Sequence, residues 1–298
     1  MLSYVSSALY KAVPLYCFGL FLTYLHPTFC FFRQADLHSN KFDGQFPHGN
    51  STQLHYLDVH DNEISMLPGS IGKHANLAYL DLSKNTFEEL PAEVAQLTKL
   101  EYLFLAENEK LEPGSIPEWL NDLPRLSAVS FKDTNRIGEL PHWLWRLDQL
   151  TMLDLEGNNI NGTILRQLHK MTSLEYLFLN RNELSGNVPD TLGNMTSLKL
   201  LNVDHNKLTG QIEDTICAMD LEVLVADCLV SETRTQPQIE CACCTKCCDP
   251  DIDQCNTRDW SKDYGENSWG GYYIRYNILD EGDVYKQVQI NAEKNGSD

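Results

Sequence analysis

The stretch LTMLDLEGN, residues 150–158, has leucine at its first, fourth and sixth positions and asparagine at its ninth. The same frame recurs along the middle of the chain, in five further copies that keep the asparagine and in two imperfect ones. The five copies are Leu54-Leu57-Val59-Asn62, Leu77-Leu80-Leu82-Asn85, Leu100-Leu103-Leu105-Asn108, Leu174-Leu177-Leu179-Asn182 and Leu198-Leu201-Val203-Asn206. The imperfect copies are Leu126-Val129-Phe131-Thr134 and Leu221-Leu224-Ala226-Cys228. Successive first leucines are 23, 23, 26, 24, 24, 24 and 23 residues apart.

This frame and period predict a leucine-rich repeat solenoid. The expected fold is α/β, a right-handed superhelix shaped as a curved horseshoe with a concave parallel sheet. It has about eight repeats, a degenerate first repeat around Asn40 and a cysteine-rich C-terminal cap. The leucines should point inward, and each asparagine should bond backbone groups where the chain leaves its strand. Cys228 stands at an asparagine position, so it is either such a structural residue or a disulfide partner.

The second half of the later repeats follows an L-x-G-x-[IV]-P pattern, as in Leu184–Pro189. This pattern resembles plant-type leucine-rich repeats of receptor-like proteins and receptor kinases, over roughly residues 35–228. The resemblance implies recognition of a ligand without identifying it. A short second strand is expected at the Ile or Val after the glycine. The Leu-Pro turns at residues 90 and 140 instead resemble cytosolic Ras-binding adaptors.

Charge and motifs narrow the functional classes. The 298 residues carry a formal net charge of -19, which argues against nucleic acid and against an anionic membrane surface as partners. Basic peptides or cations remain compatible. The sequence contains none of the common nucleotide-binding, protease, hydrolase or kinase motifs, so we expect a protein that is not an enzyme and needs no cofactor.

The two ends of the chain differ from the repeats. Residues 12–32 contain no Asp, Glu, Lys or Arg, so residues 1–33 are predicted to be a signal or anchor segment, the only contact with a membrane. An apolar cap on the first repeat is the alternative. Repeats are assigned to residues 34–229, and a cap with an aromatic tail to residues 230–298. The tail could form a hairpin from residues 272–279 and 284–290.

Of ten cysteines, eight cluster near the C-terminus. They are Cys217, Cys228, Cys241, Cys243, Cys244, Cys247, Cys248 and Cys255. We expect disulfides rather than a metal site, although Cys244 and Cys247 have ligand spacing. The block resembles the C-terminal end of leucine-rich repeat proteins from diatom-like algae. Disulfides favour a secreted or membrane-anchored protein with extracellular repeats over a cytoplasmic one. Glycosylation candidates are Asn50, Asn161, Asn194 and Asn295.

The outward positions of the predicted strands form an aromatic stripe beside an acidic one. The candidate ligand-binding residues are Tyr56, Asp58, Tyr79, Asp81, Tyr102, Phe104, Asp154, Glu156, Tyr176, Phe178 and Asp204. Tyrosine is favoured at interfaces, and carboxylates favour a basic partner. Alternatively, strand tyrosines simply reflect β-propensity.

The main functional hypothesis is therefore an exported or anchored recognition protein that binds a protein, peptide or glycan and needs a co-receptor with a signalling domain. An intracellular scaffold, a wall or adhesion protein and an enzyme inhibitor are the alternatives.

Overall fold

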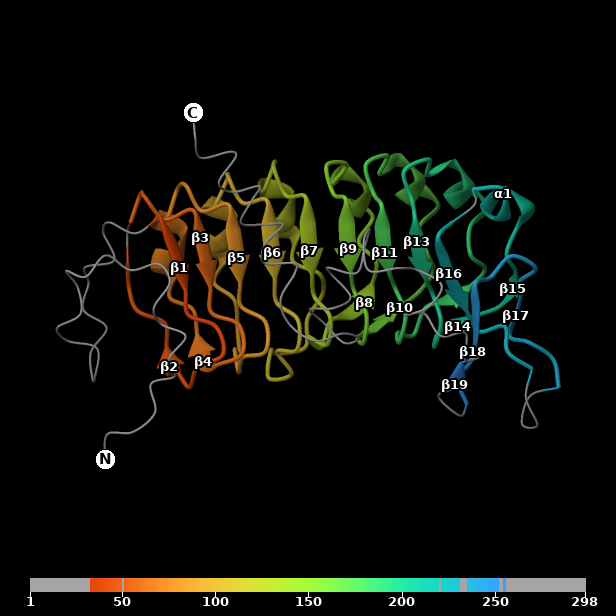
Figure 1. Cartoon of the computed structure of the whole chain (residues 1–298), viewed down its shortest axis with the longest axis horizontal. Helices are drawn as coiled ribbons and strands as arrows, with labels where there is room; N and C mark the ends of the chain where they lie inside the picture. The colour runs from red at the N-terminus through yellow and green to blue at the C-terminus, as the bar shows by residue number, and fades with distance from the viewer. Residues whose placement is uncertain (1–32, 50, 220, 231–234, 252–253, 256–298) are drawn as a thin grey trace.

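A computed structural model describes residues 33–49, 51–219, 221–230, 235–251 and 254–255. Its main feature is a sheet in which ten parallel strands follow one another in chain order (Figure 1). These strands are β1 (Gln34–Asp36), β3 (Tyr56–Asp58), β5 (Tyr79–Asp81), β6 (Tyr102–Phe104), β7 (Ala128–Ser130), β9 (Met152–Asp154), β11 (Tyr176–Phe178), β13 (Leu200–Asn202), β16 (Val223–Ala226) and β18 (Lys246–Asp249). A last strand, β19 (Gln254–Cys255), pairs antiparallel with β18. The predicted leucine-rich repeat solenoid is confirmed.

Short helical turns form the other side of the solenoid. They are the 3-10 helices η2 (Gly69–Lys73), η3 (Ala92–Gln96), η4 (Glu118–Asp122), η5 (Leu144–Arg146), η6 (Arg166–Lys170) and η7 (Asp190–Asn194), followed by the α-helix α1 (Asp214–Cys217). Pro68, Pro91, Pro117 and Pro189 immediately precede four of them in extended conformation. The fixed φ of proline suits the entry to a helical turn, which explains the prolines of the repeat pattern.

Outside the main sheet, segments from different repeats pair to form four two-stranded parallel sheets. They pair β2 (Asp43–Gln45) with β4 (Glu63–Met66), β8 (Ile137–Glu139) with β10 (Asn159–Asn161), β12 (Ser185–Gly186) with β14 (Lys207–Leu208), and β15 (Gly210–Gln211) with β17 (Ile239–Glu240). The second strand therefore exists, but it forms around the position of the glycine and does not reach the Ile or Val after it. The side chains of Ile164 and Val188 are buried in the core instead.

The leucines of the repeat frame form the core. Leu57, Leu80 and Leu103 occupy matching positions on neighbouring strands, and none is more than 1% exposed. Burying one leucine side chain contributes about 1.5–3 kcal/mol. A single repeat cannot hide its own leucines, so the stack of repeats, and not any one of them, is the stable unit.

The asparagines form the predicted ladder. In one repeat, Asn85 donates through Nδ2 to the carbonyls of Val59, Leu82 and Ser83, and its Oδ1 accepts the backbone N–H of Ile64. Each such amide thus satisfies buried backbone groups of its own repeat and of the preceding one. Asn40 likewise donates to backbone carbonyls, which confirms the degenerate first repeat.

The residue before each ladder position is in the left-handed conformation. Asp61, Lys84, Glu107, Asp133, Arg181 and His205 have φ between 50° and 57°, and Gly157 has φ 68°. Only one of these seven positions holds glycine, so a search of the sequence for recurring glycines did not reveal this turn. The strain of each turn is offset by the ladder bonds that follow it.

The last repeat is closed differently. Cys228 forms a disulfide with Cys247, so its interpretation as a ladder residue is wrong. The side chain of Gln238 donates to the carbonyls of Asn206 and Leu208 in the preceding repeat. The cap thus satisfies two backbone carbonyls at the C-terminal end of the repeats with a side-chain amide of its own.

Four disulfides join the eight clustered cysteines: Cys217–Cys243, Cys228–Cys247, Cys241–Cys244 and Cys248–Cys255. Such density is typical of proteins that fold in an oxidising compartment. Among the residues whose structure is described, no helix has the length and apolar character needed to cross a bilayer. The predicted signal or anchor segment up to residue 32, the tail hairpin, Asn50 and Asn295 lie outside those residues.

Candidate functional site

The outward face of the main sheet, opposite the leucine core, places four aromatic rings together. Tyr56, Tyr79 and Tyr102 are direct register partners on β3, β5 and β6. The rings of Tyr56 and Tyr79 stack with centroids 4.4 Å apart, and those of Tyr79 and Tyr102 are 5.9 Å apart. Phe104 adds an edge contact at 5.7 Å from Tyr79. We call these four residues the aromatic row.

Two carboxylates lie directly beside the aromatic row. Asp58 and Asp81 are register partners, and each accepts the phenol hydroxyl of the tyrosine two residues earlier, at 3.2 Å for Tyr56 and 3.4 Å for Tyr79. Asp58 also accepts the backbone N–H of His60, and Asp81 that of Ser83. These bonds fix the carboxylates and tyrosines as one polar and aromatic surface.

This surface is buried, whereas the sequence predicted an exposed stripe. The exposed fraction is 4% for Tyr56, 3% for Tyr79 and 0% for Asp58 and Asp81, while Tyr102 is half-buried. Tyr56, Asp58, Tyr79 and Asp81 make interactions beyond those given above, so none of these groups is free. A ligand that reaches them has to replace existing contacts.

The predicted residues of the later repeats do not join the aromatic row. Ala128 and Met152 lie between Tyr102 and Tyr176 in the order of strands. Tyr176 is half-buried, and desolvation by burial raises the pKa of its phenol. Phe178 is 2% exposed. The aromatic stripe is therefore split into two parts.

The acidic residues of those later repeats are paired. Glu156 lies 3.3 Å from the ammonium of Lys132 and 4.0 Å from Arg181. Asp154 accepts the hydroxyl of Ser130 at 3.0 Å, and Asp204 is bonded to the ring of His205. The charge of Glu156 is therefore already compensated by Lys132 and Arg181.

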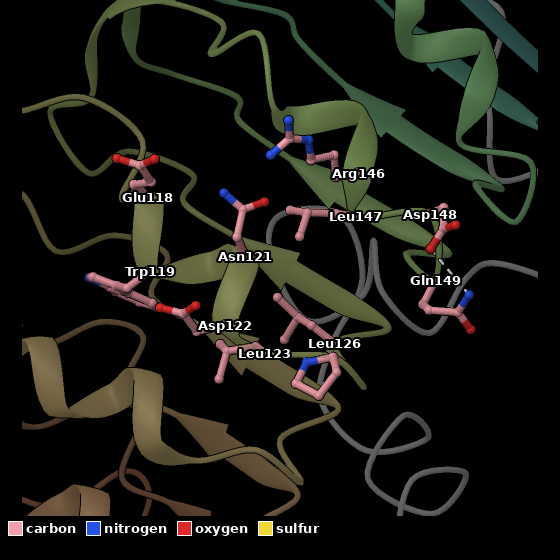
Figure 2. Close-up of a pocket in the computed structure, with 11 residues that line it drawn as sticks. Glu118, Trp119, Asn121, Asp122, Leu123, Leu126, Arg146, Leu147, Asp148 and Gln149 are labelled. Atoms are coloured by element: carbon pink, nitrogen blue, oxygen red, sulfur yellow. Dashed lines mark hydrogen bonds between the residues drawn. The ribbon is translucent and has the colours of Figure 1, made fainter.

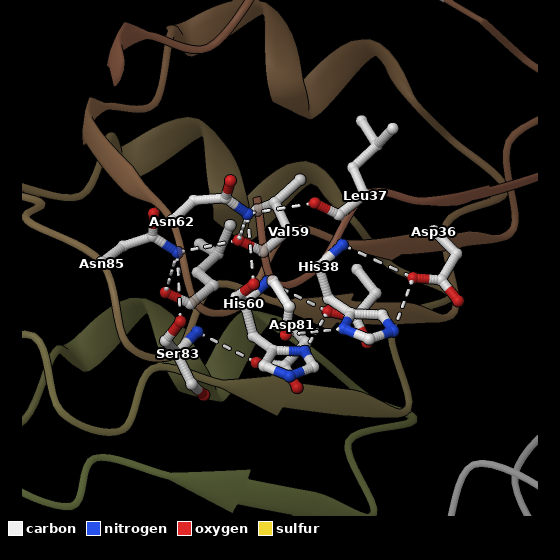
Figure 3. Close-up of polar contacts among 12 residues, drawn as sticks. Asp36, Leu37, His38, Val59, His60, Asn62, Asp81, Ser83 and Asn85 are labelled. Carbon is white, nitrogen blue, oxygen red and sulfur yellow. Dashed lines mark hydrogen bonds and ion pairs between the residues drawn. The ribbon is translucent and has the colours of Figure 1, made fainter. Parts of the chain in front are cut away.

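Sequence reasoning missed a histidine pair at the N-terminal end of this face (Figure 3). The rings of His38 and His60 stack with centroids 4.7 Å apart, and Asp58 lies 2.7 Å from Nδ1 of His60. The repeated Asp-x-His of residues 36–38 and 58–60 was the signal that could have revealed it. Ligand atoms of Asp58, His60 and Asp81 all lie within 4.8 Å of one another, so this donor set could hold a divalent cation.

A surface depression of about 810 Å³ lies on the helical side, between η4 and η5 (Figure 2). Trp119 and Asp122 line one side and Arg146 and Asp148 the other. It coincides with the longest repeat, whose first leucines are 26 residues apart. The mixed lining offers no recognisable catalytic arrangement.

Two glycosylation candidates can be placed. Asn161, in β10, and Asn194, at the end of η7, are both exposed. Either side chain is therefore accessible to a modifying enzyme, which makes the sequons usable in a secreted protein.

Comparison with known proteins agrees with the fold. Residues 28–136 match the family model for a leucine-rich repeat region, and residues 149–171, 173–195 and 197–219 match the model for a leucine-rich repeat. None of the curated proteins compared with the sequence matches it.

Several solved structures are similar. The plant peptide hormone receptor RGFR1, solved in complex with RGF2, is 25% identical with a TM-score of 0.55, over 63% of this chain and 34% of the receptor. The Arabidopsis receptor kinase HAESA, solved with the peptide hormone IDA and the co-receptor SERK1, is 24% identical with a TM-score of 0.55, over 67% of this chain and 38% of that one.

The ectodomain of GASSHO1/SCHENGEN3 from Arabidopsis thaliana is 22% identical with a TM-score of 0.55, over 65% of this chain and 30% of that one. The chain therefore spans about a third of the length of these plant ectodomains. From the repeat frame, the sheet it builds and these matches, the chain is a leucine-rich-repeat-containing protein.

Proposed function

We propose that the protein is a non-catalytic recognition protein that binds a peptide or protein segment with a basic group on the outward face of its first repeats. The observation that carries the proposal is the aromatic row with Asp58 and Asp81 beside it. Stacked tyrosines offer rigid apolar area with polar ends, which is the composition of interface hot spots.

The charge of the site determines the class of ligand. Asp58 and Asp81 are adjacent on neighbouring strands and fully buried. Two carboxylates in a low-dielectric environment favour a cationic partner such as Arg or Lys. The attraction between a carboxylate and a cation is stronger there than in water. The net charge of -19 adds a long-range attraction for a basic ligand.

Burial of the site sets a condition on binding. Because Tyr56 and Tyr79 are almost fully buried, ligand binding is expected to begin at half-buried Tyr102 and then to displace the contacts that cover its neighbours. Such a rearrangement lowers the association rate without requiring weak final affinity.

Compartment and partner follow from the same proposal. Four disulfides favour an extracellular protein over an intracellular scaffold. The RGFR1 complex with RGF2 supports a peptide ligand, and HAESA with its co-receptor supports a second, signalling protein as partner. Detection of glycan on Asn161 or Asn194 would exclude the cytosolic alternative.

Selection from a random peptide library displayed on phage tests the proposal. We expect enrichment of peptides that contain Arg or Lys beside an aromatic residue, with affinity that falls as salt concentration rises. Asp58→Asn combined with Asp81→Asn, which keeps side-chain shape, should weaken the selected peptides about tenfold or more.

The matched control is Glu88→Gln combined with Glu89→Gln, which removes two exposed carboxylates elsewhere. This control should leave affinity within experimental error. If the selected peptides bound the Asn variant as well as the wild type, the outward face of the first repeats would not be the binding site.

A further inference from the structure

The C-terminal cap brings two disulfides into contact. The Sγ atoms of Cys228, Cys241 and Cys244 all lie within 4.8 Å of one another, and all three residues are half-buried. Cys241 and Cys244 are bonded to each other, and Cys228 is bonded to Cys247. A sulfur of one disulfide is thus a neighbour of a sulfur of the other.

We propose that Cys241–Cys244 is a redox-responsive site, which a dithiol reductant opens while the repeats stay folded, and that its freed thiol then exchanges with Cys228–Cys247. This inference is independent of the recognition role. The substrate class is a small or protein-borne dithiol.

Loop length distinguishes this disulfide from the others. Cys241 and Cys244 are separated by 3 positions, against 7 for Cys248–Cys255, 19 for Cys228–Cys247 and 26 for Cys217–Cys243. A disulfide that closes a short loop restricts the unfolded chain least. Folding should therefore stabilise Cys241–Cys244 least against reduction, by roughly tenfold in equilibrium constant relative to Cys217–Cys243.

The backbone on both sides of this disulfide is held by other contacts. Before it, β17 pairs with β15 and the side chain of Ile239 is fully buried. Within it, Cys243 is tied to Cys217. After it, Thr245 bonds the backbone of Leu224 in both directions. Opening Cys241–Cys244 removes a cross-link without releasing the segment.

The chemistry balances in two steps. First, the dithiol attacks Cys241–Cys244 through a mixed disulfide. It is oxidised to its own disulfide, and both cysteines become thiols. Second, the thiolate of Cys241 or Cys244 attacks Sγ of Cys228. A new sulfur–sulfur bond forms to Cys228, the bond to Cys247 breaks, and Cys247 leaves as thiolate and is protonated.

The second step has a structural consequence. Cys247 lies in β18, and Cys228 follows β16, the neighbouring strand. Exchange therefore moves the covalent link of the last repeat from β18 to the segment before it, at Cys241 or Cys244. β18 itself would then be held against β16 by hydrogen bonds alone, while Cys217–Cys243 and the new bond to Cys228 hold the segment before it.

Partial reduction of the native protein tests the first step. The protein is incubated with graded dithiothreitol, alkylated at once and mapped by mass spectrometry, while circular dichroism follows folding. We expect label at Cys241 and Cys244 at roughly tenfold lower dithiothreitol than at Cys217 and Cys243, with an unchanged spectrum. Simultaneous labelling of all eight cysteines, or labelling of Cys241 and Cys244 last, would overturn the proposal.

A single substitution tests the second step without reductant. Cys241→Ser leaves Cys244 unpaired beside Cys228, so we expect a share of molecules with a Cys228–Cys244 bond and a free Cys247. As control, Cys255→Ser frees Cys248, which lies outside this sulfur cluster and should stay reduced beside three native pairs. Finding only Cys228–Cys247 with free Cys244 would refute exchange, and if Cys241→Ser fails to fold, the wild-type reduction still decides.

Discussion

A side chain on residue 157 would overlap the carboxylate of Asp133. A Cβ placed on Gly157 would lie 2.8 Å from Cγ of Asp133 and closer still to its Oδ1. Gly157 also has φ 68°, at the left-handed position that precedes each ladder asparagine. Other residue types adopt the left-handed conformation at the equivalent positions, so the close approach of Asp133 is what distinguishes position 157.

We expect Gly157→Ala to lower the free energy of unfolding by about 2–3 kcal/mol, as the sum of a left-handed backbone penalty and a steric overlap. Urea denaturation measures the loss. Gly138→Ala is the matched control, because Gly138 has φ 84° but nothing within 4 Å of an added Cβ. It should cost only about 1 kcal/mol.

The overlap itself can be removed by a second substitution. In a protein that already carries Asp133→Ala, Gly157→Ala should lower the free energy of unfolding by no more than Gly138→Ala does. An unchanged cost in that background would mean that the backbone conformation alone requires glycine.

Asn158 is expected to be among the residues least tolerant of substitution. Its Nδ2 donates to the carbonyls of Phe131, Leu155 and Glu156, and its Oδ1 accepts the backbone N–H of Arg136 at 2.8 Å. Asn158→Ala leaves these buried groups without partners, so we predict a loss of about 3 kcal/mol.

The neighbouring Asn159 serves as the control for Asn158. Asn159 is exposed, so Asn159→Ala should change the free energy of unfolding by less than about 0.5 kcal/mol. Equal losses for the two variants would contradict the ladder as the source of the effect.

The parts of the fold that sequence could predict are those with a strict period. The leucines and asparagines recur at fixed offsets, so Leu57, Leu80 and Asn85 could be assigned from the pattern alone. The left-handed turn could not, because Lys84 and Asp61 differ in size and in the sign of their charge. The disulfide pairs could not either, since eight cysteines allow 105 pairings and only the fold selects Cys228–Cys247.

The candidate site shows the same division. The alternation of inward and outward side chains along each strand correctly grouped Tyr56, Tyr79 and Tyr102, because the register of neighbouring strands follows from the repeat. Alternation did not indicate that Glu156 is neutralised by Lys132 from the preceding repeat. It also did not indicate burial of the outward face, since exposure depends on contacts that no single strand determines.

Stability should fall as pH rises through the acid range. Burial raises the pKa of Asp227 from 3.8 to about 6, partly opposed by hydrogen bonds from the backbone of His205 and Asn206. The folded protein therefore binds more protons than the unfolded chain between these two pKa values. By linkage, its free energy of unfolding decreases with pH across that window, by at most about 3 kcal/mol for this group.

Two other groups act in the same direction. Burial raises the pKa of Asp133 to about 6, and the hydrogen bond to Asp204 raises the pKa of His205, whose contribution is lost as pH rises through its folded value. Urea denaturation from pH 4 to pH 7 measures the slope for the wild type and for Asp227→Asn. The variant should show a shallower decline, and an identical slope would remove Asp227 as a cause.

The hydrogen bonds of Gln238 at the C-terminal end of the repeats give a graded prediction. Its Nε2 donates to the carbonyl oxygens of Asn206 and Leu208, at 2.7 and 2.8 Å. Gln238→Ala removes both donors, at a cost of about 1 kcal/mol because water can partly replace them at this half-buried site. Gln238→Glu should cost more, since it places a carboxylate against two carbonyl oxygens. Gln236→Ala, at an exposed residue two positions earlier, should be neutral. If Gln238→Glu were no more destabilising than Gln238→Ala, the two hydrogen bonds of the amide could not be what stabilises this end of the repeats.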